Sequence, residues 1–150
     1  MSYMKIAVRE ALSGIEAGDG GPFGAAVVKD GRVIGRGHNR VIADCDPTMH
    51  GEIAAIRDAC RSTGSHSLKG AVLYTTAYPC PMCMCAAMWA NVDKIVYGCN
   101  AHDTADIGFR DEDFYNAFEG KNFPAEISCE DREDCLKLFE HYRKLHGERY

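Results

Sequence analysis

The dipeptide Asp30-Gly31 lies between two apolar runs and constrains the fold more than any other feature of this sequence. Aspartate followed by glycine is a strong signal for a two-residue hairpin, because both positions tolerate the positive φ of a type I′ turn. The flanking runs then become a buried strand over residues 23–28 and a second strand over residues 32–39. Two more strands and two helices alternate after this hairpin, with the strands at 72–76 and 94–98 and the helices at 48–60 and 81–90. This order predicts a mixed sheet covered on both faces by helices, in one three-layer α/β/α domain over residues 1–150.

Four further segments complete this prediction. A first helix is capped by Ser2 and stopped by Gly18, with apolar residues at the helical period between them. Residues 100–108 are predicted as a loop, and residues 109–118 as irregular chain or a short helix. A last helix over 131–146 would turn its apolar side chains inward, namely Cys135, Leu138, Phe139, Tyr142 and Leu145.

Charge and composition exclude several classes of protein. Among 150 residues the formal net charge is -5, and the C-terminal third is rich in acids, so no basic surface for nucleic acid is expected. No run approaches the roughly 18 apolar residues of a membrane span, and the N-terminus lacks the layout of a secretory signal. The eight cysteines do not suit a small disulfide scaffold in a chain of this size. We therefore expect a cytoplasmic, reduced protein that binds neither membranes nor nucleic acid.

Two short segments carry the chemistry: His50-Gly51-Glu52, and the run from Pro79 to Cys83. Each opens a predicted helix, and Cys80 and Cys83 are spaced so that both sulfurs reach one ion. Zinc takes imidazole nitrogen and thiolate sulfur in tetrahedral geometry, and a catalytic site keeps one position for water. The positive end of the second helix favours thiolates. His50, Cys80 and Cys83 are therefore predicted to bind one Zn²⁺.

A closed structural zinc site or a redox dithiol remains the alternative for the Cys-x-x-Cys pair. A structural site needs a fourth strong ligand, and Cys85 lies about 200° round the helix from Cys83, which makes it a poor one. Most of the other cysteines are expected to be small buried hydrophobes. These are Cys45, Cys60, Cys99, Cys129 and Cys135.

Glu52 lies two residues after His50, too near for a comfortable second ligand. We expect it to act as the catalytic acid/base. The pattern His-x-Glu followed by Pro-Cys-x-x-Cys is typical of zinc deaminases that act on nucleobases. In such a reaction Glu52 would accept a proton from the attacking water, deliver it to a ring nitrogen beside the attacked carbon, and later protonate the leaving amine.

With these motifs the chain resembles the cytidine/deoxycytidylate deaminase superfamily, and within it the bacterial guanine deaminases. The resemblance runs almost end to end, through the segments 20–25, 28–31, 46–48 and 73–76 to the Gly108-Phe109 loop and Tyr150. It implies a central mixed sheet of five strands, one zinc per subunit, and hydrolysis of guanine to xanthine and ammonia.

The resemblance also implies which residues hold the base. Asn39 would bind it through the side-chain amide, and Phe23 would stack on the ring. Asp111 would accept hydrogen bonds from N1 and the 2-amino group of guanine, with Glu112 and Asp113 as competitors. Tyr150 would close the pocket, and Trp89 would contribute to its wall. The family also implies a homodimer that exchanges a C-terminal segment, about residues 129–150, so that Tyr150 completes the partner's site.

Two departures from the family pattern leave the substrate open. Gly51 stands where the bacterial guanine pattern has alanine, and Ala77-Tyr78 precedes Pro79 where a glutamate directly before Pro-Cys is common. Cytosine or an amino-triazine is therefore an alternative substrate, and a tRNA adenosine is a second one. A non-enzymatic zinc module that binds other proteins is the alternative of a different class.

Overall fold

The computed structural model of the protein describes residues 2–150, so the predicted start of the domain at residue 1 lies outside it. One mixed sheet forms its centre, with strands in the order β2-β1-β3-β4. β1 pairs antiparallel with both β2 and β3, and β3 pairs parallel with β4. The bounds are Gly24–Lys29 for β1, Arg32–His38 for β2, Val72–Ala77 for β3 and Lys94–Cys99 for β4. The predicted hairpin and mixed sheet are confirmed.

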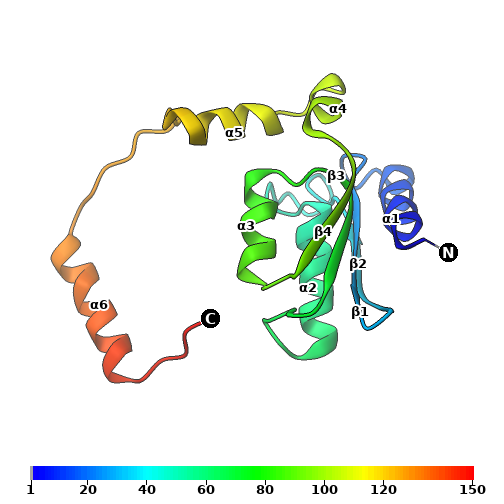
Figure 1. Cartoon of the computed structure of the whole chain (residues 1–150). Helices are drawn as coiled ribbons and strands as arrows, with labels where there is room; N and C mark the ends of the chain where they lie inside the picture. The colour runs from blue at the N-terminus through cyan, green and yellow to red at the C-terminus, as the bar shows by residue number, and fades with distance from the viewer. Residues whose placement is uncertain (1) are drawn as a thin grey trace.

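Helices cover both faces of this sheet, as Figure 1 shows. α1 (Tyr3–Ala17) lies on one face, and α2 (Gly51–Thr63) and α3 (Pro81–Trp89) lie on the other. The three-layer α/β/α prediction is therefore confirmed. α2 begins three residues later than the predicted helix, because the backbone N–H and hydroxyl of Thr48 donate to Asp46 at 2.8 and 2.7 Å and hold a turn there.

Small residues bring α2 close to the sheet. A Cβ at Gly35 of β2 would lie 2.4 Å from the backbone nitrogen of Ala59 and 2.5 Å from the carbonyl oxygen of Ala55. Ala55 and Ala59 are fully buried in the core, together with Val27 of β1 and Leu73 of β3. This close packing fixes the position of the N-terminal end of α2, where His50 and Glu52 lie.

The chain after β4 differs from the prediction in two respects. The implied fifth strand is not found within residues 2–150, whose sheet has four strands. The segment predicted as a loop instead contains α4 (Ala101–Asp106), which begins with a capping box. The Asn100 side chain accepts from Asp103 N at 2.9 Å, and the Asp103 carboxylate accepts from Asn100 N at 2.8 Å. These reciprocal bonds stabilise a helix where the polar composition suggested a loop.

The C-terminal segment leaves the body of the molecule. Residues 109–118, predicted as irregular chain or a short helix, contain most of α5 (Asp111–Gly120). An extended stretch then leads to α6 (Arg132–Lys144), which stands apart from the sheet (Figure 1). None of the described residues of α6 is buried. The predicted inward orientation of its apolar side chains is therefore wrong for this chain, because no other layer lies against them. Cys135 and Cys129 are exposed for the same reason, and Cys45 and Cys99 are exposed as well, contrary to prediction.

No helix within residues 2–150 is both long enough and apolar enough to cross a bilayer. The cytoplasmic location stays a prediction.

Candidate metal centre and substrate cavity

Two helix starts meet at the centre of the site. His50 is the residue that precedes α2, and Cys80 is the residue that precedes α3. Both have extended backbone angles, and Pro81 follows Cys80 as the first helical residue, where its fixed φ suits the turn. The chain therefore presents an imidazole and a thiol from two helix N-termini, and Cys83 adds its sulfur one turn into α3.

The donor atoms of His50, Cys80 and Cys83 all lie within 4.8 Å of one another. The distance from His50 Nδ1 to Cys80 Sγ is 3.6 Å. Tetrahedral zinc with bonds of about 2.3 Å to sulfur and about 2.0 Å to nitrogen separates such ligands by about 3.5 Å. The two cysteines are buried, and one histidine with two sulfurs is a donor set that zinc favours. These residues therefore fit one zinc ion and leave a fourth position.

The electrostatics of the two thiols point to the same conclusion. Hydrogen bonding from Cys83, and further from His50, lowers the pKa of Cys80 to about 4. The same shared bond and burial raise the pKa of Cys83 well above its usual range. Hydrogen bonding to Cys80 also raises the pKa of His50. The two sulfurs thus share a hydrogen bond, and a divalent cation that bound both as thiolates would displace the proton between them.

Glu52 lies in the first turn of α2 and is 6% exposed. The hydroxyl of Thr75, on β3, donates to Glu52 Oε1 at 3.0 Å. Burial raises the pKa of the Glu52 carboxyl above its usual value. A buried carboxyl with a raised pKa beside a metal-binding group has the properties of a general acid/base.

A cavity of about 340 Å³ opens onto this group, and both His50 and Glu52 line it. Phe23 and Phe109 form one wall, with ring centroids 4.8 Å apart in an edge-to-face arrangement. Asn39 lines the cavity from the end of β2 and is 4% exposed. The structure thus places Phe23 and Asn39 beside the metal-binding group.

Asp111, the first residue of α5, lines the same cavity. The sequence left Glu112 and Asp113 as competitors of Asp111 for binding the base. Glu112 Oε1 lies 3.9 Å from His102 Nδ1 instead, and Asp113 is exposed. Burial raises the pKa of the Asp111 carboxyl. A half-buried carboxylate at the mouth of an apolar cavity can accept two hydrogen bonds from neighbouring N–H groups of a ligand.

Several lining residues were not anticipated from the sequence. Arg110 and Phe114 line the cavity beside Asp111, and the guanidinium of Arg110 lies 5.2 Å from the centre of the Phe114 ring. Ile42 and Pro47 contribute from the loop after β2. Arg110 and Phe114 are four residues apart, so on a helix they would lie on one face beside Asp111. The sequence predicts either irregular chain or a short helix here, so this spacing alone does not assign them to the cavity.

Trp89 and Tyr150 do not line this cavity in the described part of the chain. They lie against each other, with ring centroids 5.9 Å apart, and both are largely exposed. Tyr150 also contacts His66. The structure therefore brings seven of the nine predicted site residues together and leaves these two aromatic residues elsewhere.

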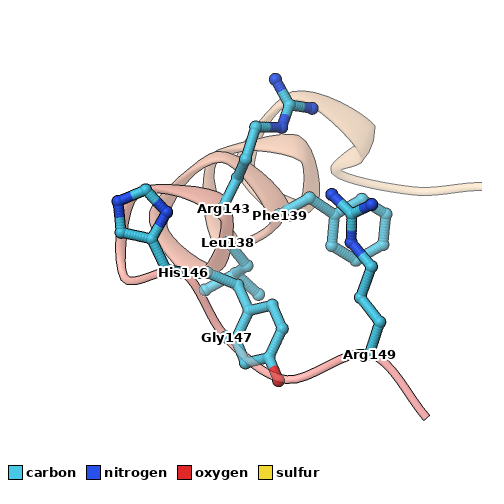
Figure 2. A pocket seen from close by; sticks show the side chains of 7 residues that line it. Leu138, Phe139, Arg143, His146, Gly147 and Arg149 are labelled. Carbon is cyan, nitrogen blue, oxygen red and sulfur yellow. The ribbon is translucent and has the colours of Figure 1, made fainter.

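The C-terminal segment has an open hollow of its own, of about 930 Å³ (Figure 2). Phe139, Arg143 and Arg149 lie around it, on α6 and the tail that follows. None of the residues that line it belongs to the predicted site.

Comparison with known proteins gives a consistent result. A profile of the cytidine and deoxycytidylate deaminase zinc-binding region matches residues 1–99. Guanine deaminase of Bacillus subtilis is 43% identical over 118 residues, which are 79% of this chain and 76% of that protein. A tRNA-specific adenosine deaminase of Aquifex aeolicus is 40% identical over 95 residues, which are 63% of this chain and 62% of that protein.

The solved structures agree with the sequences. The X-ray structure of guanine deaminase from Bacillus subtilis superimposes with a TM-score of 0.87 at 37% identity, covering 99% of this chain and 96% of that one. The guanine deaminase of Nitrosomonas europaea superimposes with a TM-score of 0.69 at 33% identity, covering 73% of this chain and 63% of that one.

Proposed function

Because this chain belongs to the cytidine and deoxycytidylate deaminase family, we propose that its substrate is guanine, which it hydrolyses to xanthine and ammonia. Family membership makes the protein a zinc-dependent hydrolytic deaminase. The choice of guanine among nucleobases is the step that the proposal adds. Structural similarity to the guanine deaminase of Bacillus subtilis along almost the whole chain supports that choice.

One observation carries the proposal: Asp111 and Asn39 line a single cavity together with His50 and Glu52. Guanine presents adjacent N–H donors at N1 and the 2-amino group, which match the two oxygens of a carboxylate. It also presents acceptors at O6 and the ring nitrogens, which match an amide donor. Cytosine offers no such pair of adjacent donors around a protonated ring nitrogen, so Asp111 favours guanine.

We assign the zinc ligands to His50, Cys80 and Cys83. Zinc bound there would supply a Lewis acid that makes water acidic enough to act as a nucleophile near neutral pH. Glu52 would accept a proton from the attacking water, transfer it to the ring nitrogen beside the carbon under attack, and then protonate the departing amine. Burial raises the pKa of the Glu52 carboxyl, which supports its assignment as the proton carrier. Water adds to the carbon and ammonia leaves, so atoms and charge balance.

We also propose a homodimer in which residues 129–150 exchange between subunits and Tyr150 closes the cavity of the partner. The apolar side chains of α6, exposed within one chain, support this assignment. Leu138 is 66% exposed, Phe139 67% and Leu145 65%, a row that a second subunit would cover.

The experiment that tests the function measures ammonia release by zinc-loaded protein from guanine, cytosine, adenine, their nucleosides, amino-triazines and a transfer RNA. Guanine should exceed the other bases by a large factor. A preference for cytosine or a triazine would contradict the assignment of Asp111, and deamination of adenosine in tRNA would favour the activity of the Aquifex aeolicus relative.

Glu52→Gln separates metal binding from catalysis. The variant should keep one zinc per subunit but lose at least about 100-fold in kcat, because the amide cannot shuttle a proton. Zinc content by atomic emission and ammonia release measure the two effects. A variant that retained appreciable turnover would rule out the proposed role of Glu52.

A further inference from the structure

The side-chain amide of Asn39 has a fixed orientation. Its Oδ1 accepts hydrogen bonds from the backbone N–H of Val41 at 3.1 Å and of Gly21 at 3.3 Å. Two donors facing one end of the amide identify that end as oxygen. Within residues 2–150, no protein acceptor is hydrogen-bonded to Nδ2. Asn39 therefore offers a donor, and no acceptor, to a ligand in the cavity.

The two residues on either side of Asn39 are held by one carboxylate oxygen. Asp19 Oδ2 accepts from His38 Nε2 at 2.8 Å and from Arg40 Nη1 at 2.7 Å. The Asp19 side chain is 17% exposed, as is that of His38. Charge-assisted bonds of this length in a partly buried place are among the stronger ones a protein makes. Asp19 thus restrains the chain immediately before and after Asn39.

The backbone of Asp19 restrains the same region. Its N–H donates to the carbonyl of Gly14 at 2.9 Å, and its carbonyl accepts from Ile42 and Ala43, both at 3.0 Å. Asp19 therefore links the end of α1 to the loop that follows β2, and Ile42 of that loop lines the cavity.

The next residue shows how little room the amide has. A Cβ at Gly20 would lie 2.1 Å from Asn39 Oδ1, so a side chain at Gly20 would displace the amide. The segment from Asp19 to Gly21 thus encloses Asn39 from one side.

We propose that Asp19 is a positioning residue for substrate binding, because it fixes both neighbours of Asn39 and so directs Nδ2 toward the base. The proposal rests on the proposed function to the extent that Asn39 contacts the base. It narrows the substrate class to heterocycles that place a carbonyl oxygen or an unprotonated ring nitrogen opposite Asn39.

A double-mutant cycle between Asp19 and Asn39 tests this role. Asp19→Ala should raise KM about tenfold for the base that the wild type deaminates, with kcat within about twofold, because the lost bonds are charge-assisted. Asp19→Asn should have a smaller effect, since its amide oxygen still accepts a hydrogen bond. In the Asn39→Ala background, Asp19→Ala should raise KM less than about twofold, because Asp19 acts through Asn39. Equal effects in both backgrounds would overturn the proposal.

Asp44→Ala is the matched control. Asp44 pairs with the same Arg40 at 2.8 Å but, within residues 2–150, makes no hydrogen bond to His38 or Asn39. This variant should keep the wild-type KM, and a KM change as large as that of Asp19→Ala would mean that general loosening of the loop is responsible.

Amide hydrogen exchange separates this inference from the proposed function. The amides of Gly21 and Val41, which bond to Asn39, should exchange about tenfold faster in Asp19→Ala and at the wild-type rate in Asp44→Ala. This readout needs no turnover, so it remains decisive if no tested base releases ammonia and the proposed function fails. Unchanged exchange at both amides in Asp19→Ala would overturn the positioning role by itself.

Discussion

The hydrogen bond from Thr75 to Glu52 shows how a single buried residue can tune the proposed acid/base. Thr75 is 1% exposed, and its hydroxyl lies within hydrogen-bond distance of both Glu52 Oε1, at 3.0 Å, and the carbonyl of Ala77, at 3.2 Å. Donation to the carboxylate lowers the pKa of Glu52, against the larger rise that burial causes.

Thr75→Val should therefore raise the pKa of Glu52 further. Glu52 must be ionised to accept a proton from water, so the acidic limb of kcat/KM should move to higher pH. A lost hydrogen bond to a charged group predicts a fall in kcat/KM of about tenfold below that limb. Rate measurements across the pH range test this. Thr75→Ser keeps the hydroxyl and should restore the wild-type profile, and an unshifted profile in Thr75→Val would contradict the argument.

The residues of the metal-binding group were accessible from the sequence because their geometry is local. Cys80 and Cys83 are one helical turn apart, and His50 precedes a helix whose apolar residues are regularly spaced. The structure brings them together with Glu52 as expected. Phe109 and Phe114 could not be assigned in the same way, because their places in the cavity depend on how the chain turns after β4.

At the level of elements, α5 carries the residue proposed to read the base, yet none of its described residues is buried. A hydrogen bond holds it to the residue before Cys80: the Tyr115 hydroxyl donates to the carbonyl of Pro79 at 2.6 Å. Because burial raises the pKa of Tyr115 to about 12, the hydroxyl stays protonated throughout the usual range of an activity assay.

Tyr115→Phe should loosen α5 and weaken binding through Asp111. The loss of one hydrogen bond predicts an increase of about fivefold in the KM for guanine. Zinc content and thermal stability should change little, because α5 contributes no buried residue to the core. Steady-state kinetics, zinc analysis and thermal unfolding measure these effects. A large fall in zinc content would show instead that the bond supports the metal-binding loop.

The helices and strands before residue 100 agree with those predicted from the sequence, and those after it do not. Hydrophobic periodicity is reliable where a face packs on the sheet, as in β1 and α2. α6 has the same kind of periodicity but no layer against it within one chain, so the pattern predicted burial that the structure does not show. The sequence at the start of α4 predicts a loop, because Asn and Asp are common in loops as well as in the capping boxes of helices.

At the scale of the whole molecule, exchange of the tail between subunits predicts recovery of activity in mixtures. Glu52→Gln has an intact tail, whereas a chain lacking residues 129–150 keeps Glu52. Each should be inactive alone, the second because its partner supplies no Tyr150. When the two are unfolded and refolded together, hybrid dimers should regain activity, up to about half that of the wild type per dimer, because each contains one complete site.

Sedimentation of the full-length protein provides the accompanying measurement and should give a dimer. Restored activity in the mixture would support exchange of the tail. A mixture as inactive as its components, in a protein that sediments as a dimer, would mean that each tail serves its own subunit.

The boundary at β4 has a consequence for inheritance. The region that matches the family profile ends at Cys99, the last residue of β4. Asp111 lies beyond it on α5, in which none of the described residues is buried. The residues proposed for hydrolysis, together with Asn39, are thus encoded before this boundary, and Asp111 is encoded after it. A single recombination near that boundary would replace the segment that carries Asp111 and leave the residues proposed for hydrolysis unchanged.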